Sequence, residues 1–243
     1  MLRQCYNIIK NIIKRNLHEF RIDTNSRILV ISPHPDDESI GMGGFLSKYK
    51  NNCDVVLVTN GALGNPEWSK EKTIEIRRQE FIDALTYIGI QNYYMLEIMD
   101  QEANRNLACL KQVLNKKYDY IFVPNRHDIH PDHNCLYRCV KRYIKRKRLD
   151  CLLVEYEVWT PLERPNFYLD ISACFQEKEE AVKKYVSQIK HAKYDWGSLG
   201  LNRYRGMLSG VSYAEAYFIN KPILDRIVDK IMYRVNIMRK KKR

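Results

Sequence analysis

The chain has 243 residues, of which 45% are hydrophobic and 29% charged; this composition excludes a disordered protein and supports one large folded domain. Its seven cysteines show no regular spacing, which argues against a disulfide framework and for a reducing compartment. The formal net charge of +12 indicates an anionic partner such as nucleic acid, anionic lipid or a phosphorylated molecule.

A basic amphipathic helix is predicted over residues 1–22. Isoleucines alternate there with lysine and asparagine, and residues 2–15 carry four cations and no acid. The segment has no small-residue cleavage site, so we do not interpret it as a secretory signal.

The following residues, 23–220, are predicted to form one α/β domain, Rossmann-like, with a mostly parallel sheet flanked by helices. Apolar strands alternate with helical stretches, which is typical of a parallel sheet covered on both faces. In chain order we expect strands at 27–32, 54–59, 93–96, 118–123 and 152–158, and helices between them at 38–50, 71–88, 107–116 and 134–147. A strand at 167–171, a helix across 177–191 and a strand at 214–219 complete the domain.

A second basic amphipathic helix is predicted over residues 221–243. Apolar residues recur there at spacings of three and four beside a stripe of cations, and the chain ends in five consecutive cations. Both terminal segments fit helices that lie on an anionic membrane, or alternatively helices that dock on the body. No apolar run approaches the ~20 residues that span a bilayer. A third basic run, at residues 141–148, is interpreted as cations that meet a helix C-terminus favourably.

The strongest functional signal lies in the turn after the first predicted strand. Residues 31–44 read Ile-Ser-Pro-His-Pro-Asp-Asp-Glu-Ser-Ile-Gly-Met-Gly-Gly. They place His34, Asp36 and Asp37 at a strand end, where open α/β sheets put their chemistry. Two successive carboxylates on an extended turn point different ways, so one suits a metal ligand and the other a place beside the metal. The alternative is that one of them caps the following helix.

The glycines of this motif invite a dinucleotide-binding interpretation. In a dinucleotide fingerprint, however, the glycines form the strand-to-helix turn itself. Here they fall a helical turn after the carboxylates, which would repel a pyrophosphate. Close packing of the helix on the sheet explains them better.

A second cluster, His127-Asp128-Ile129-His130-Pro131-Asp132-His133, follows another apolar run. His127 taken alone is interpreted as an ordinary surface or core histidine. Catalytic zinc usually takes three protein ligands from histidine and carboxylate, so two strand ends rich in these residues predict a divalent-metal site. Iron(II) accepts the same donors.

Together these residues resemble the zinc-dependent N-acetylglucosaminyl-phosphatidylinositol de-N-acetylase superfamily, also called PIG-L/LmbE-like. The resemblance rests on Pro33–Glu38 with Gly43-Gly44, and on Asp128-x-His130-x-Asp132-His133. Supporting matches are Arg77-x-x-Glu80-x-x-x-Ala84, Asp100, Lys184 with Ser187-Gln188, and Tyr213-Ala-Glu-Ala-Tyr217. The basic tails lie outside the resemblance.

The resemblance implies an enzyme that removes the acetyl group of an N-acetylated amino sugar of N-acetylglucosamine type, linked to a glycoconjugate or lipid. It implies the following zinc ligands: His34, Asp37 and His133. Asp36 is then the general base that takes the proton of a water activated by the metal. His130 would stabilise the oxyanion or protonate the leaving amine, with Asp132 orienting its ring.

Arg77 and Asp100 are substrate contacts on the resemblance alone, and Arg77 is about equally well explained as a surface helix residue paired with a nearby acid. We expect a cytoplasmic protein; its tails either hold it peripherally on the inner face of the membrane or dock on the domain. A hydrolase of another amide or ester would share the same metal site. A nucleic-acid-binding module would use the charge and the seventeen tyrosines, but the cations lie in tails rather than on one basic and aromatic surface, so no specific nucleic acid is expected.

Overall fold

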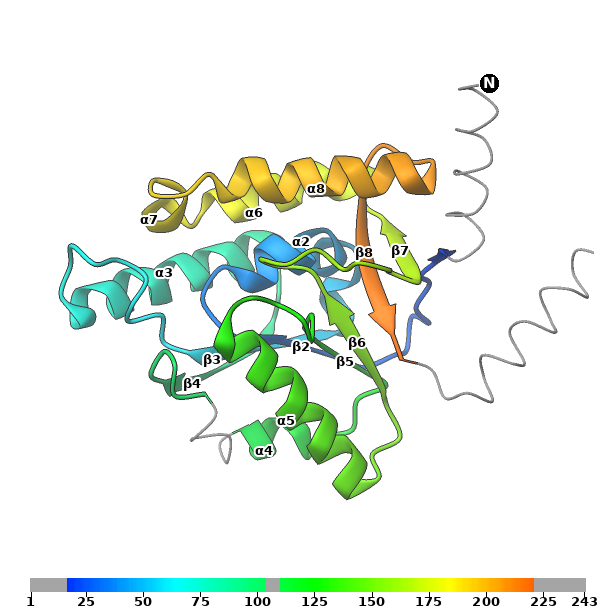
Figure 1. Ribbon diagram of the computed structural model, residues 1–243, viewed down its shortest axis with the longest axis horizontal. Coiled ribbons are helices and arrows are strands. Elements are labelled where there is room, and N and C mark those ends of the chain that lie inside the picture. The colour runs from blue at the N-terminus through cyan, green and yellow to red at the C-terminus, as the bar shows by residue number, and fades with distance from the viewer. Residues whose placement is uncertain (1–16, 104–109, 221–243) are drawn as a thin grey trace, which may run out of the picture.

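The structure is a computed structural model that describes residues 17–103 and 110–220 (Figure 1). The predicted tail helices at 1–22 and 221–243 therefore lie almost entirely outside the described residues. The described end of the first one differs from the prediction, because His18–Glu19 form strand β1. Phe20 is buried in the core there and donates its backbone N–H to Tyr168 O at 2.6 Å, which favours extended over helical backbone. Within the described ranges, no helix is both long and apolar enough to cross a membrane.

One eight-stranded sheet organises the chain, in the order β1-β7-β8-β6-β5-β2-β3-β4. Strand β8 pairs antiparallel with β6 and β7, and the other pairings are parallel. This confirms the predicted mostly parallel α/β sheet. The strands are β2 (Ile28–Ser32), β3 (Cys53–Thr59), β4 (Asn92–Ile98), β5 (Tyr120–Pro124), β6 (Leu152–Tyr156), β7 (Phe167–Asp170) and β8 (Ala214–Ile219).

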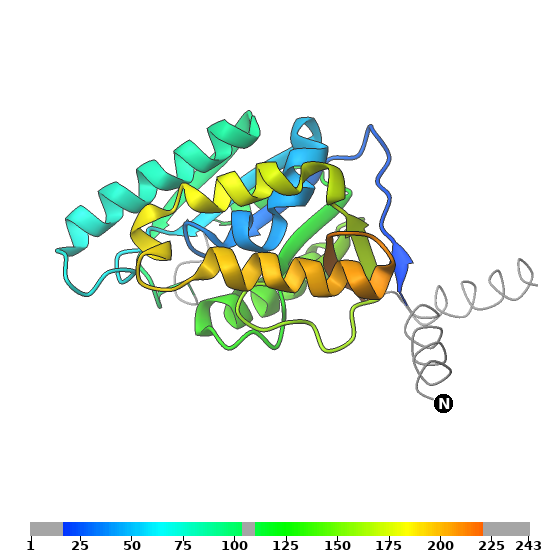
Figure 2. The same cartoon turned by 90° about the horizontal axis from the view of Figure 1, so that it is seen from above.

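Helices cover both faces of the sheet (Figures 1 and 2). One face carries α2 (Asp37–Tyr49), α3 (Lys70–Ile88), α6 (Phe175–Lys183), α7 (Val186–Ile189) and α8 (Tyr194–Ser209). The other carries α4 (Leu110–Leu114) and α5 (Pro131–Lys147). Two short 3-10 helices, η1 (Lys50–Asn52) and η2 (Ser172–Cys174), complete the described elements. Because strand side chains alternate between the two faces of a sheet, Val30 and Ile31 of β2 pack into two separate hydrophobic cores.

The glycines of α2 allow that helix to lie close to its neighbours. A Cβ on Gly41 would lie 2.4 Å from Tyr156 Cδ2, and a Cβ on Gly44 would lie 2.6 Å from Ile171 Cγ2. Both distances are shorter than carbon atoms tolerate, so only glycine fits at this spacing. This supports the packing interpretation of these glycines over nucleotide binding.

The helix predicted across residues 177–191 is instead two helices, α6 and α7, separated at Lys184–Tyr185. Buried Tyr185 donates its hydroxyl to Glu38 at the break, and Ser187 donates its backbone N–H to Glu80 at 2.7 Å. These tertiary hydrogen bonds replace the continuous helix that the local sequence favours.

Strand β2 occupies the topological switch point of the sheet. The chain proceeds from β2 to β3 and β4 on one side, then returns to β5 on the other. The loops that leave β2 and β5 therefore diverge and open a crevice at the carboxyl edge of the sheet, the usual ligand site of open α/β folds. Both His and Asp motifs follow these two strands.

Candidate metal centre and active site

The first motif turns sharply between β2 and α2. Asp36 has φ 131°, a strained conformation for a non-glycine residue. It occupies the N-cap position of α2, yet its side chain makes no capping hydrogen bond. The capping alternative is therefore not what the structure shows for Asp36, and the turn separates its carboxylate from that of Asp37.

Three side-chain atoms from the two motifs form a buried triangle. His34 Nδ1 lies 3.2 Å from both Asp37 Oδ2 and His133 Nε2, and His133 Nε2 lies 3.1 Å from Asp37 Oδ2. A tetrahedral zinc ion with ligands roughly 2.0–2.1 Å away holds those atoms about 3.3 Å apart. Asp37 Oδ1 is buried without a hydrogen-bond partner, which leaves a free acceptor beside the triangle. The donor set and its spacing therefore fit a divalent cation.

A carboxylate lies behind each histidine of the triangle. Asp132 Oδ2 lies 3.2 Å from His34 Nε2, and Asp128 Oδ1 lies 3.3 Å from His133 Nδ1. Such partners fix the tautomer and the orientation of metal-binding histidines. Asp128 is itself held by the backbone N–H groups of Trp159 and Thr160, both at 3.1 Å.

This arrangement differs from the expectation that Asp132 orients His130. The side chain of Asp132 contacts His34 instead, and only its backbone N–H reaches His130 Nδ1, at 3.3 Å. The physical reason is that α5 begins at Pro131, so His130 is the N-cap residue and its ring accepts from the first turn of the helix.

Neighbouring charges shift the pKa values of all three residues of the triangle, even without a metal ion. Burial opposes charge on His34, but hydrogen bonds with Asp132 and Asp37 outweigh it and raise the pKa of His34 to about 10. Burial likewise opposes charge on His133, and the nearby Asp37 and Asp128 raise its pKa to about 9. Burial would raise the pKa of Asp37, but the two histidines lower it well below its usual range. The site therefore holds positive charge where a cation would bind.

Asp36 lies beside the triangle in a different environment. Burial raises the pKa of Asp36 to about 8, opposed by the guanidinium of Arg77. Arg77 Nη2 donates to Asp36 Oδ2 at 3.0 Å and to Pro35 O at 2.6 Å. An added Cβ on Gly64 would lie 2.4 Å from Arg77 Nη1, so the glycine leaves the room that this buried guanidinium needs.

A pocket of about 330 Å³ opens beside these groups, and its lining includes His34, Asp36, Arg77, Asp100, His130 and Tyr194. Asp100 accepts the backbone N–H groups of Gly61 and Leu63, at 3.0 and 2.9 Å, and so fixes the loop after β3. Burial lowers the pKa of His130, and the positive histidines beside it lower it further. His127 is exposed and lines a different cavity.

Sequence reasoning assigned no role to Asp128, nor to the pocket-lining side chains of Trp159, Gln188 and Tyr194. Asp128 carried a signal, because it lies five residues before His133 within the acidic and histidine-rich cluster. Trp159 lies in the loop after β6, Gln188 in α7 and Tyr194 at the start of α8, and only the fold brings them to the pocket.

Replacing Asp128 with asparagine is expected to weaken divalent-metal affinity about 10–100-fold, because the negative charge behind His133 is lost while the shape is kept. Metal titration against a chelator of known affinity measures this. Asp150→Asn, at an exposed site beyond α5, is the matched control. Unchanged affinity in Asp128→Asn would show that this carboxylate does not support a metal ligand.

The chain is similar in sequence and fold to known proteins. Residues 29–144 match the model of the PIG-L family, described as GlcNAc-PI de-N-acetylase. A protein named probable N-acetyl-alpha-D-glucosaminyl L-malate deacetylase 2, from Bacillus cereus, is 29% identical over 184 residues, which cover 66% of this chain and 83% of that protein. The diacetylchitobiose deacetylase of Thermococcus kodakarensis is 24% identical over 216 residues, 78% of this chain and 81% of that protein.

Among solved structures, a conserved protein of Thermus thermophilus superimposes with a TM-score of 0.66 at 28% identity, covering 82% of this chain and 96% of that one. The fold and the cluster of histidine and aspartate side chains define the class of protein: an α/β enzyme with a candidate metal-binding site. Residues 29–144 therefore match a PIG-L family domain, and the curated relatives that the chain resembles are named as deacetylases.

Proposed function

We propose that this protein hydrolyses the acetamide of an N-acetylated amino sugar of N-acetylglucosamine type, joined to a glycoconjugate or lipid carrier, and releases acetate and a free amine. The observation that carries the proposal is the buried triangle of His34, Asp37 and His133 with Asp36 beside it. The names of the two curated relatives both specify removal of acetyl groups from amino-sugar compounds, which supports this choice of substrate.

We assign His34, Asp37 and His133 as the ligands of a zinc ion; iron(II) would accept the same donors. A bound divalent ion polarises the amide carbonyl and lowers the pKa of a water molecule. The unpartnered Asp37 Oδ1 and the 3.1–3.2 Å spacing of the donor atoms support this assignment.

Asp36 is the general base in this proposal. A base works best when its pKa lies near the working pH, and burial brings the pKa of Asp36 to about 8. Arg77 holds one carboxylate oxygen at 3.0 Å, which limits the carboxylate to a single orientation toward the pocket. Arg77 thus acts first as a positioning residue for Asp36, and its place on the pocket wall keeps it within reach of the substrate.

His130 serves the other side of the reaction. Its lowered pKa keeps the ring neutral near pH 7, and its Nδ1 accepts the backbone N–H of Asp132. The remaining proton then lies on Nε2, which is free to donate to the developing negative charge or to the departing nitrogen.

The pocket sets a limit on what part of the substrate is enclosed. A volume of about 330 Å³ lies at the small end of ligand pockets, so it suits one sugar residue with its acetyl group. The carrier then remains outside, where Trp159, 37% exposed, stands at the rim. Asp100 also lines the pocket and offers a carboxylate to sugar hydroxyls.

The decisive experiment measures acetate released from free, nucleotide-linked and lipid-linked N-acetylglucosamine by the full chain loaded with zinc or iron(II). We expect release that a chelator abolishes and that re-added metal restores, with one carrier class preferred. Absence of release from every member of the panel by metal-loaded protein would overturn the proposal. Release that survives complete metal removal would overturn the metal assignment.

A further inference from the structure

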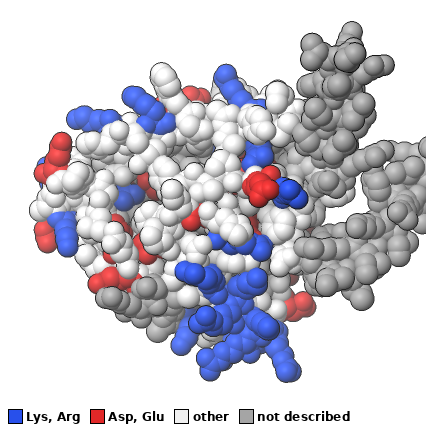
Figure 3. Space-filling view, viewed as in Figure 1, with Lys and Arg blue, Asp and Glu red and all other residues white. Residues whose placement is uncertain are grey.

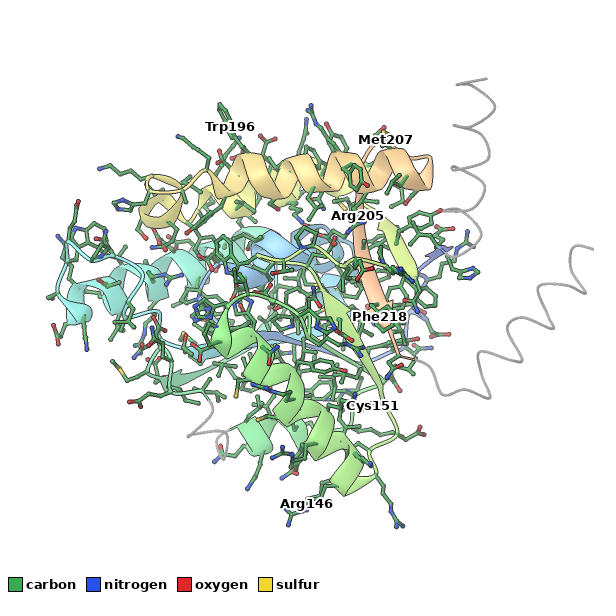
Figure 4. All side chains as sticks on the ribbon, viewed as in Figure 1. Arg146, Cys151, Trp196, Arg205, Met207 and Phe218 are labelled. Atoms are coloured by element: carbon green, nitrogen blue, oxygen red, sulfur yellow. The ribbon has the colours of Figure 1, made fainter. Side chains whose placement is uncertain are left out.

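The outer face of α5 carries a stripe of cations. Its members are all exposed: Arg138, Lys141, Arg142, Lys145, Arg146, Lys147 and Arg148. No acid lies between Asp132 and Asp150, and none of the seven forms an ion pair with a described carboxylate. Figure 3 shows a patch of Lys and Arg atoms over the lower part of the molecule, where Figure 1 has α5, and Figure 4 shows Arg146 projecting away from the body.

The helix dipole does not account for this stripe. Its favourable effect on cations is confined to the last turn of a helix, which here contains Lys145, Arg146 and Lys147. Arg138, Lys141 and Arg142 lie one to two turns earlier and still face outward. A surface of one sign produces an attractive field for anions that extends beyond single contacts, so the stripe fits an extended anionic partner.

The stripe ends close to the strand beside which the described chain ends. Arg148 caps the end of α5, a few residues before β6 begins at Leu152. Ile219, at the end of β8, pairs with Val154 of β6, and Asn166 donates to Ile219 O beside the pairing of β1 with β7. The described chain therefore ends at residue 220 after a strand that pairs with β6, the strand that follows α5. In sequence, residues 2–15 hold four cations, and residues 221–243 hold nine cations and two acids.

The chemistry of the stripe favours lipid over nucleic acid. Proteins that bind single strands offer aromatic side chains on which bases stack, and the exposed large aromatics here lie away from α5, at Tyr87, Trp159, Trp196 and Tyr204. The apolar positions of the terminal sequences recur at spacings of three and four beside cations, which suits the headgroup region of a membrane.

We propose that α5 lays its cationic stripe on an anionic lipid bilayer. The site lies at the other end of this helix, which is about 25 Å long by its 17 residues. Lipid binding does not require deacetylation, so this surface and the proposed reaction are tested separately.

The test is co-sedimentation of the full chain with phosphatidylcholine vesicles, with or without phosphatidylglycerol. We compare wild type, the triple variant Lys141→Gln/Arg142→Gln/Lys145→Gln, and the charge-matched control Lys70→Gln/Lys72→Gln/Arg203→Gln on the opposite face of the sheet. Each basic residue near an anionic surface contributes several-fold, so the α5 variant is expected to lose about tenfold or more of its partition coefficient. The control variant is expected to stay near wild type.

Two results would overturn the proposal. One is equal partition of the α5 variant and wild type on phosphatidylglycerol vesicles, which would mean that the tails alone, or nothing, bind lipid. The other is binding to duplex DNA at physiological salt without binding to vesicles, which would assign the stripe to nucleic acid. All six substituted positions are exposed, and an unchanged thermal transition in each variant excludes unfolding as the cause.

Discussion

Asp36→Asn is expected to lower kcat about 10²- to 10⁴-fold while the bound metal stays in place. Asparagine has the same shape and still offers an oxygen to Arg77, but it has no carboxylate to take a proton. Asp36 also stands outside the triangle of candidate ligand atoms, so its replacement leaves the donor set complete. Acetate release and elemental metal analysis of the same preparation measure the two effects together.

The paired control for this experiment is Asp37→Asn, one residue along the same turn. Asp37 Oδ2 lies 3.2 Å from His34 Nδ1 and 3.1 Å from His133 Nε2, so we expect this variant to lose metal and activity together. If the two variants behave alike, the separation of the two carboxylates into base and ligand is wrong. Full activity in Asp36→Asn would exclude it as the base.

The parts of the fold that could be predicted from the sequence are those whose buried residues are apolar. Strand β8 was predicted with its observed bounds, and β2, β5 and β6 within two residues, because most residues of these strands are apolar and buried. Helix α8 (Tyr194–Ser209) was not predicted. Its buried residues are Asn202, Arg205, Gly206 and Ser209, so it has no apolar stripe to detect.

Helix α8 could not be predicted from the sequence for two further reasons. Glycines at positions 197, 200 and 206 each cost about 1 kcal/mol of intrinsic helix propensity. Tertiary contacts override that cost, since Arg205 pairs with buried Glu157, and Asn202 donates to Ala214 O at 3.0 Å. Gly206 is also required by the packing, because a Cβ there would lie 2.6 Å from Ser212 O. None of these contacts is visible in the local sequence.

The meeting of the two motifs was predictable for a different reason. Strands β2 and β5 are neighbours at the switch point, and residues that follow such strands converge whatever their side chains. The finer orientation of side chains was not predictable. It depends on the first residue of α5, which was expected near Asn134 and lies at Pro131. This shift of three residues in the start of α5 explains why the side chain of Asp132 faces His34 rather than His130.

The metal site should also respond steeply to pH. The pKa values of His34 and His133 are raised to about 10 and about 9 in the chain alone. Both rings are therefore protonated there at neutral pH, on the nitrogens that a cation would use. Protons and the metal compete, so metal uptake near pH 7 is expected to release about two protons. The affinity should then rise about a hundredfold for each unit of pH below about 9, where both rings still hold their protons.

The same pKa values determine how the stability of the metal-free protein changes with pH. A histidine pKa raised by folding stabilises the folded state at pH values below the ordinary histidine pKa of 6.5, and this contribution is lost as the pH rises through about 9 and about 10.

Calorimetric metal titration in buffers of different ionisation enthalpy counts the protons that metal binding releases, and chelator competition at several pH values gives the metal affinity. The control is His133→Gln, which removes one donor and is expected to abolish stoichiometric binding. An affinity that does not change with pH would mean that the ion binds somewhere other than these two rings, since no metal can occupy their nitrogens without displacing the protons.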